Sequence, residues 1–234
     1  MITSLELLTA QECARAEQAL KALRADWTPR GDAPASFHTL GAASYMDAGL
    51  VYSRRAAAIN PKLVEHFGWL YDKLCEFLGW RLGAGVELAA PFALPGFHVW
   101  ETPAIFTQPQ ASVHFDLQQL RVWSRDTPGA DFAHPLSFTL AIRLPRGGGG
   151  LNVWDITHER FAHFCERVAG RVDPAHVAAL LPPMRHAYSV GSIAIHSGLL
   201  MHQIGEIAAV EPGDERITLQ GHALKVGGTW RIYW

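Results

Sequence analysis

From about residue 86 to its end, the sequence divides into short segments rich in β-branched and aromatic residues, separated by clusters of Pro, Gly and Asp. Segments of this kind, spaced by turn residues, are typical of β-strands. Eight of them read as strands: FHVWE, ASVHFDL, LSFTLAIRL, LNVWDI, SIAIHSG, LLMHQIG, RITLQGHAL and WRIYW. Because little helical sequence alternates with them, the pattern favours an antiparallel sandwich or barrel over a parallel α/β fold.

The first 85 residues have a helical pattern instead. Thr9 and Glu12 form a capping-box pattern at the start of an amphipathic helix over residues 9–26. A second helix is predicted to begin at Asn60 and Pro61, an N-cap and first-turn pair, and to end near Gly79. The sequence between these helices is predicted to be a loop with room for one short strand or helix.

A chain of 234 residues is long enough for one large domain with a substantial core. We expect a single domain over residues 1–234, with a helical support region at 1–85 and a β core at 86–234. The segment THERFAHFCERVAG has a helical pattern, and a further turn of helix is expected after Asp173 and Pro174. The β core is therefore predicted to carry a helical insertion near residues 157–181.

The composition is that of a globular protein, with 49% hydrophobic and 18% charged residues. A formal net charge of −2 argues against a nucleic-acid partner, because such binding relies on clustered Lys and Arg. The three cysteines have neither disulfide nor zinc-site spacing, and we expect neither a leader nor a membrane partner. The sequence predicts a cytoplasmic protein, either a monomer or a homodimer.

Two polar residues in the predicted strand ASVHFDL need an explanation. Side chains alternate along a strand, so His114 and Asp116 are expected on one face, close enough to bind the same ion. The simpler interpretation of this pair is a strand histidine hydrogen-bonded to its neighbour. A third ligand would favour the metal site, and His202 in the strand LLMHQIG is the best candidate. Two imidazoles and one carboxylate leave three positions open on an octahedral ion, as in non-haem Fe(II) oxygenases.

An arginine and a hydroxyl follow on the next predicted strand. Arg216 and Thr218 lie two residues apart, and therefore on one face. A guanidinium group binds a carboxylate through two parallel hydrogen bonds, and a neighbouring hydroxyl can add a third.

With these residues, the sequence resembles the Fe(II)/2-oxoglutarate-dependent oxygenase family. The signature of that family is H-x-D, a distal His, and then R-x-S or R-x-T on the following strand. The residues His114-Phe115-Asp116, His202 and Arg216-Ile217-Thr218 match it in order and type. The resemblance covers roughly residues 90–225. It implies a mainly β fold whose core is a double-stranded β-helix, the cupin-like jelly roll, supported by N-terminal α-helices.

The resemblance also implies roles for individual residues. His114, Asp116 and His202 would bind Fe(II), while Arg216, helped by Thr218, would bind the distal carboxylate of the cosubstrate 2-oxoglutarate. The other end of 2-oxoglutarate would contact a glutamine, either Gln108, Gln110 or Gln118. Gln118 is the first choice because it continues the face of His114 and Asp116 along the strand.

The reaction that the resemblance implies is hydroxylation of a substrate C–H bond by O₂, with conversion of 2-oxoglutarate to succinate and CO₂. Halogenating relatives replace the carboxylate ligand with a small residue, so Asp116 favours hydroxylation. Nucleic-acid demethylating relatives carry a second Arg six residues after the first, where this chain has His222. A small-molecule substrate is therefore expected, either an amino acid derivative or a specialised metabolite.

Other residues are candidates for binding the substrate. Five are predicted from strands that line the pocket of related oxygenases: His98, Trp100, Phe106, Asn152 and Trp154. Core packing is the competing interpretation for the aromatic residues among them. The alternative function is a cupin-like metal-dependent enzyme, or a small-molecule-binding jelly-roll protein, that does not use 2-oxoglutarate. The lack of an H-x-H motif counts against it.

Overall fold

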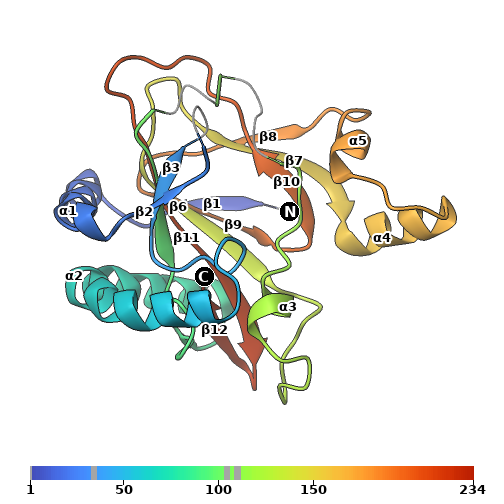
Figure 1. The fold of residues 1–234 in the computed structure, drawn as a ribbon, viewed down its shortest axis with the longest axis horizontal. Helices are drawn as coiled ribbons and strands as arrows, with labels where there is room; N and C mark the ends of the chain where they lie inside the picture. Colours follow the sequence, from blue (N-terminus) through green and yellow to red (C-terminus); the bar gives the residue numbers. More distant parts are fainter. Residues whose placement is uncertain (1, 33–35, 103–105, 108–111) are drawn as a thin grey trace.

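The computed structural model describes residues 2–32, 36–102, 106–107 and 112–234. In chain order (Figure 1), its helices are α1 (Ala10–Ala22), the 3-10 helix η1 (Arg24–Asp26), α2 (Leu50–Leu82), α3 (Gln119–Val122), α4 (His158–Arg167) and α5 (Pro174–Ala178). Its strands are β1 (Thr3–Glu6), β2 (Thr28–Arg30), β3 (Phe37–Leu40), β4 (Val86–Leu88), β5 (Gly96–Trp100), β6 (Leu136–Arg143), β7 (Gly150–Thr157), β8 (Met184–Ala187), β9 (Ser192–Ser197), β10 (Leu200–Ile204), β11 (Arg216–Val226) and β12 (Thr229–Tyr233).

The described strands form two sheets. The larger is nine-stranded, with the order β1-β9-β6-β11-β5-β3-β2, and β12 and β4 extend it beside β11. The smaller is three-stranded, with the order β10-β7-β8. The pairing is antiparallel except between β12 and β4. The predicted mainly β fold with antiparallel sheets is therefore confirmed.

Seven of the eight predicted strands correspond to observed ones, namely β5, β6, β7, β9, β10, β11 and β12. The exception is the segment that carries the H-x-D pair. Its described residues form only an isolated bridge, between His114 and His202. The prediction of a regular strand there is wrong, because this segment pairs with β10 at one position and then turns into α3.

The first predicted helix is confirmed as α1. Thr9 caps it, and the capping box is complete, since the Glu12 side chain accepts a hydrogen bond from the Thr9 backbone N–H at 2.8 Å. The buried residues of α1 are Cys13, Ala16 and Leu20, which is the spacing of one helix face.

The predicted start of the second helix is wrong. Helix α2 begins at Leu50 and runs through Pro61, which lies inside it. Its buried residues continue the apolar stripe upstream of the proline: Tyr52, Ala56, Ile59, Leu63, Phe67, Leu70, Tyr71, Leu74 and Leu78. The burial of this whole face outweighs the roughly 3 kcal/mol that an internal proline costs. Asn60, predicted as the cap, instead bonds to the backbone of Phe92 and Leu94.

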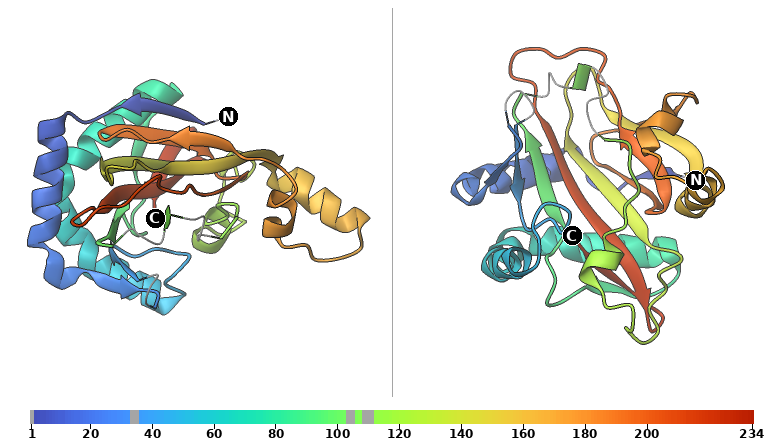
Figure 2. Two further views of the ribbon diagram at one scale, coloured as in Figure 1. Left: turned by 90° about the horizontal axis from the view of Figure 1, so that it is seen from above. Right: turned by 45° about the vertical axis from the view of Figure 1, so that its right-hand side comes forward.

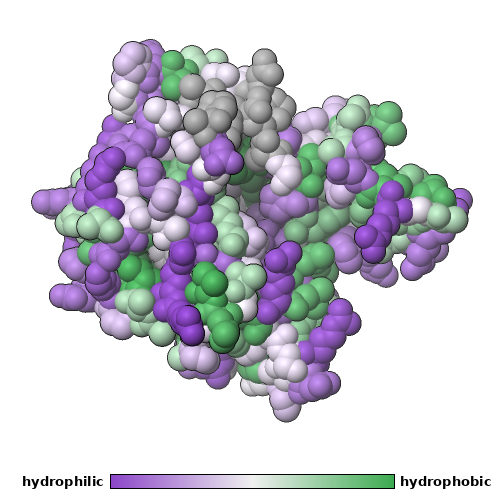
Figure 3. Space-filling model, in the orientation of Figure 1, coloured by the Kyte–Doolittle hydropathy of each residue, from purple (hydrophilic) through white to green (hydrophobic). Residues whose placement is uncertain are grey.

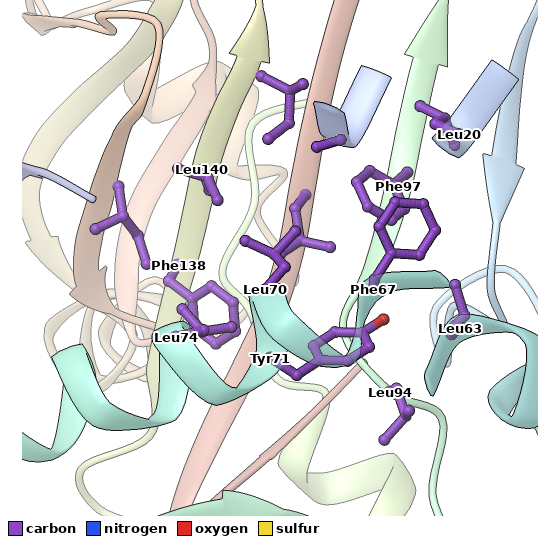
Figure 4. Close-up of a cluster of buried hydrophobic side chains, with 14 of the residues drawn as sticks. Leu20, Leu63, Phe67, Leu70, Tyr71, Leu74, Leu94, Phe97, Phe138 and Leu140 are labelled. Atoms are coloured by element: carbon purple, nitrogen blue, oxygen red, sulfur yellow. The ribbon is translucent and has the colours of Figure 1, made fainter. Parts of the chain in front are cut away.

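The hydrophobic core lies between α2 and the larger sheet. Figure 4 shows Phe67 and Leu70 of α2 pointing toward Phe97 on β5 and Leu140 on β6. Leu20 of α1 belongs to the same cluster. Helices α1 and α2 therefore share one hydrophobic core with the large sheet, which covers one face of that sheet and leaves the opposite face for the site. Residues 1–85 are not only the predicted helical support, because long-range pairing also places β1, β2 and β3 in the large sheet.

Helices α4 and α5 form the predicted insertion. They project away from the sheets on the side opposite α1 (Figures 1 and 2), and Thr157 caps α4 by accepting a hydrogen bond from Arg160 N. Hydrophobic surface is visible on this projection in Figure 3. The exposed large hydrophobic residues between the start of α4 and the end of the insertion are Phe164, Val168, Leu180 and Leu181. No helix in the described ranges combines the length and apolar character needed to cross a membrane.

Candidate metal and anion site

His114, Asp116 and His202 each bring one potential ligand atom to a common point, and these atoms lie within 4.8 Å of one another. His114 Nε2 lies 3.7 Å from Asp116 Oδ1, and His202 Nε2 lies 3.5 Å from Asp116 Oδ2. These separations exceed ordinary hydrogen-bond lengths. They suit three ligands around one divalent ion.

Both imidazole rings are held by their second nitrogen. His114 Nδ1 lies 2.8 Å from the Ser112 carbonyl oxygen, and His202 Nδ1 lies 2.8 Å from that of Leu200. A carbonyl only accepts, so each Nδ1 carries the proton. Each Nε2 is then left with a free lone pair directed at Asp116, which is how histidine ligands of metals are usually oriented.

The backbone brings the ligands together. The His114 N–H donates to the His202 carbonyl at 2.9 Å, and the His202 N–H donates to the His114 carbonyl at 3.0 Å. The Asp116 N–H donates to the Gly198 carbonyl at 2.8 Å. A Cβ on Gly198 would lie only 2.9 Å from the Asp116 carbonyl oxygen, so this close approach requires glycine.

Burial is the largest single contribution to the pKa shifts of both His202 and Asp116. It lowers the pKa of His202 to about 3, against the opposing attraction of Asp116, so this ring is neutral at pH 7. Burial also acts to raise the pKa of Asp116, but the surrounding imidazoles, His202 first among them, outweigh it and lower the pKa. Neutral imidazole and ionised carboxylate are the forms that bind a metal.

The three ligands face a cavity of about 640 Å³. Five other predicted site residues line the same cavity: His98, Trp100, Phe106, Gln118 and Arg216. The structure therefore brings together eight of the predicted residues, although they come from five separate parts of the sequence.

Arg216 is the buried cation of this cavity. Its side chain is 1% exposed, and its Nε and Nη1 have no hydrogen-bond partner among the described residues. Its guanidinium carbon lies 5.6 Å from the centroid of the Phe106 ring. Tyr188 also belongs to the cavity lining. Because a buried unpaired guanidinium is costly, this end of the cavity is suited to an anion.

Thr218 and Gln118 are placed differently from the prediction. Thr218 lies on the same face of β11 as Arg216, but it is fully buried, accepts a hydrogen bond from Gln220 at 3.3 Å, and is not part of the cavity lining. Gln118 does not continue a strand. It precedes α3 in a helical conformation, and its Nε2 donates to Asp116 Oδ1 at 3.2 Å. Gln108 and Gln110 lie outside the described residues.

Asn152 and Trp154 do not line the cavity. The Asn152 amide donates to Glu206 at 3.0 Å, and the Trp154 indole donates to the Leu181 carbonyl at 2.9 Å. Trp154 packs with Ala178 and Met201, at the base of the helical insertion. The expected substrate contacts of these two residues are not supported, because the side chains of this part of β7 are used for packing.

Several residues that line the cavity were not predicted from the sequence. Phe37 stacks on Trp100 with ring centroids 4.2 Å apart, and the Tyr45 hydroxyl lies 2.7 Å from His98 Nε2. Both residues precede the strand-rich region that begins near residue 86, and no sequence pattern in this earlier part predicted β3. His222 could have been found, because it lies on β11 in the same alternation as Arg216 and also faces the cavity.

No family model matches the sequence, and no curated protein matches it. Solved structures are similar in fold. An N-substituted L-amino acid dioxygenase in complex with α-ketoglutarate, from Burkholderia ambifaria AMMD, is 16% identical with a TM-score of 0.56, over 100% of this chain and 86% of that one.

Two further solved structures are similar to this chain in fold. The non-haem α-ketoglutarate-dependent epimerase SnoN from nogalamycin biosynthesis is 11% identical with a TM-score of 0.52, over 96% of this chain and 80% of its own. AviO1 from Streptomyces viridochromogenes Tue57 is 13% identical with a TM-score of 0.51, over 94% and 88%. The chain therefore shares its fold with a dioxygenase in complex with α-ketoglutarate, which is 2-oxoglutarate, and with a non-haem α-ketoglutarate-dependent epimerase.

Proposed function

We propose that this chain is an Fe(II)/2-oxoglutarate-dependent oxygenase that hydroxylates an unactivated C–H bond of a small molecule. The observation that carries the proposal is one cavity with two matched features. It contains a His-Asp-His group suited to a divalent ion, and a buried Arg216 with two unpartnered nitrogens. A dicarboxylate that chelates the metal at one end and binds Arg216 at the other would satisfy both.

The residues present fit this cofactor set. His114, Asp116 and His202 would hold Fe(II), since two neutral imidazoles and one carboxylate suit that ion. Bound iron, with 2-oxoglutarate and O₂, would supply the oxidising chemistry. Arg216 would hold the distal carboxylate through its free nitrogens, beside the Phe106 ring. Thr218 would orient the Gln220 side chain, which donates to it, and Gln118 would fix the Asp116 carboxylate.

The fold supports the same proposal. We infer that the nine-stranded and three-stranded sheets are the two halves of a double-stranded β-helix within a single domain. His98, Trp100 and Phe106 would contact the substrate, because they line the cavity beside the ligands. An amino acid derivative or a specialised metabolite is the proposed substrate. The solved structure that is an N-substituted L-amino acid dioxygenase supports the first of these.

Binding of 2-oxoglutarate to the metal-loaded protein tests the proposal. Mn(II) is a suitable redox-inert ion for calorimetry. We expect 2-oxoglutarate to bind at least about tenfold more tightly than glutarate, which lacks the oxo group needed for chelation, and Arg216→Met to weaken both. Metal binding without any affinity for 2-oxoglutarate would favour the cupin-like alternative. Failure to bind the metal would exclude the proposal.

A further inference from the structure

Two polar atoms in the cavity remain unused by the proposed function. They are Gln118 Oε1 and His222 Nε2, each in a side chain that is 7% exposed, and neither has a hydrogen-bond partner among the described residues. His222 lies six residues after Arg216 on β11, which is roughly 20 Å along the strand. It is therefore too far from Arg216 to bind the same small dicarboxylate.

The orientation of Gln118 is fixed by Asp116. Gln118 Nε2 donates to Asp116 Oδ1 at 3.2 Å, and a carboxylate can only accept. The amide therefore directs its NH₂ group at Asp116, and its Oε1 is left as an acceptor in a side chain that lines the cavity. This atom needs a donor from a bound molecule.

His222 is held equally firmly. Its Nδ1 lies 3.1 Å from Ser137 Oγ, and its ring packs against Tyr233 with centroids 5.9 Å apart. Ser137 also lies close to Asp116, since Ser137 Oγ and Asp116 Cβ are 3.3 and 3.5 Å from the position that a Cβ would take on Gly198. His222, Ser137 and Gln118 thus all belong to the region of the cavity around Asp116.

We propose that Gln118 Oε1 and His222 Nε2 bind a neutral hydroxyl group of the substrate, next to the metal ligands. This inference rests on the proposed function and names its substrate class. A hydroxyl has a single proton, which it can donate to Gln118 Oε1, while its oxygen accepts from His222 Nε2–H. This pairing uses the tautomer in which His222 Nδ1 accepts the proton of the Ser137 hydroxyl, 3.1 Å away. Leaving such buried atoms unpaired costs about 1–3 kcal/mol each.

Charged groups fit this pair less well. A carboxylate would place its oxygens against the Gln118 acceptor and the Asp116 carboxylate. An ammonium group would bring a full charge into a buried region beside a divalent cation. The rest of the cavity lining includes the aromatic residues Phe37, Trp100 and Phe115. We therefore expect an alcohol on an apolar, ring-containing scaffold.

Four probes on one scaffold separate these groups: 2-phenylethanol, ethylbenzene, phenylacetate and 2-phenylethylamine. Each is titrated into protein loaded with Zn(II) and 2-oxoglutarate and labelled with ¹³C-histidine, and binding is followed by NMR without turnover. We expect 2-phenylethanol to bind at least about tenfold more tightly than the other three, and to shift the His222 signal. The histidine signal that is missing from the spectrum of His222→Phe is assigned to His222.

Matched variants connect this preference to the site. His222→Phe keeps a ring but removes both nitrogens, so the preference for the alcohol should disappear. The same change at His134, whose side chain is 75% exposed, should leave it intact. If His222→Phe does not fold, as judged by thermal denaturation, His222→Asn should show the same loss because its amide is too short to reach.

Three results would overturn the inference: equal binding of 2-phenylethanol and ethylbenzene, tighter binding of either charged probe, or a preference that survives substitution of His222. Calorimetry with Mn(II) and 2-oxoglutarate is run on the same preparation. If 2-oxoglutarate binds but the alcohol is not preferred, only the hydroxyl site is wrong. If 2-oxoglutarate does not bind, the proposed function fails, and this inference fails with it.

Discussion

His114 and His202 exchange two backbone hydrogen bonds, of 2.9 and 3.0 Å, and their rings lie 4.4 Å apart between centroids. Main-chain pairing thus places two of the three candidate ligands before any ion binds. Asp116 is placed in the same way, by its bond to Gly198. A site built on backbone pairing is preorganised, which favours tight and selective metal binding.

Replacing Gly198 should damage this preorganisation. In Gly198→Ala, the new Cβ would lie 2.9 Å from the Asp116 carbonyl oxygen, so the Asp116 backbone must move. We expect a loss of about 1–3 kcal/mol in the free energy of unfolding, and a roughly 10- to 100-fold weaker affinity for Mn(II). Urea unfolding and metal titration measure the two effects. Gly68→Ala is the control, since no atom lies within 4 Å of its Cβ position, and full metal affinity in Gly198→Ala would contradict the account.

The buried charge of Arg216 should lower the free energy of unfolding of the ligand-free protein. Replacing a buried charge with an apolar side chain is often neutral, or stabilising by about 1–4 kcal/mol. We expect Arg216→Met to unfold at equal or higher urea concentration than the wild type without ligands. The extra stability that the wild type gains from Mn(II) and 2-oxoglutarate should shrink to that given by Mn(II) alone.

Arg143→Met provides the comparison for Arg216. Arg143 is partly exposed and forms ion pairs with Glu17 at 2.6 Å and with Glu215 at 2.9 Å. Its loss should therefore lower the free energy of unfolding, by about 1 kcal/mol, and leave the effect of 2-oxoglutarate unchanged. A large destabilisation of the ligand-free protein by Arg216→Met would show that Arg216 has a structural role instead.

The metal-free protein should lose stability as the pH falls below 6.5. Burial, helped by the charges of Arg216 and Arg30, lowers the pKa of His98 from 6.5 to about 3. Between these values the unfolded chain binds a proton that the folded chain does not. The stability contributed by neutral His98 is therefore complete above pH 6.5 and is lost as the pH falls toward 3.

Each such histidine lowers the free energy of unfolding by at most about 1.4 kcal/mol per pH unit. His202 adds a second contribution, because its pKa is also about 3. Urea unfolding with a chelator at pH 7, 6 and 5 measures the slope, which His98→Gln should reduce and His134→Gln should not. A stability that stays constant between pH 7 and 5 would show that these rings are accessible to protons.

The sequence was most informative where the residues have a regular spacing. The order of His114, Asp116 and His202 predicted a group that the structure does bring together. Arg216 lines the same cavity, whereas Thr218, predicted from the alternation on β11, does not. Gln118 was predicted to lie beside Asp116 because of strand alternation. It does lie there, but the chain turns into α3 after Asp116, which a pattern of alternation cannot show. The hydrogen bond to Asp116 that orients it depends on that turn.

The errors have a common cause in tertiary contacts. Local signals at Asn60 and Pro61 favoured a helix start, but the apolar face of α2 continues upstream and is buried against the sheet. Trp154 and Asn152 were expected at the cavity, whereas the insertion and Glu206 engage them. Phe37 reaches the cavity because β3 pairs with the distant strand β5, and Tyr45 lies in the turn that follows β3. Spacing within the sequence cannot reveal this long-range pairing.

The most direct test of the central claim is the visible spectrum of the protein with Fe(II) and 2-oxoglutarate in the absence of oxygen. Chelation of iron by the oxo-acid end should produce a weak charge-transfer band in the wild type. The band should weaken in Asp116→Ala, which removes a ligand, and in Arg216→Ala, which removes the anchor of the distal carboxylate. If the wild type shows no band at saturating Fe(II) and 2-oxoglutarate, the chain is not a 2-oxoglutarate-dependent oxygenase.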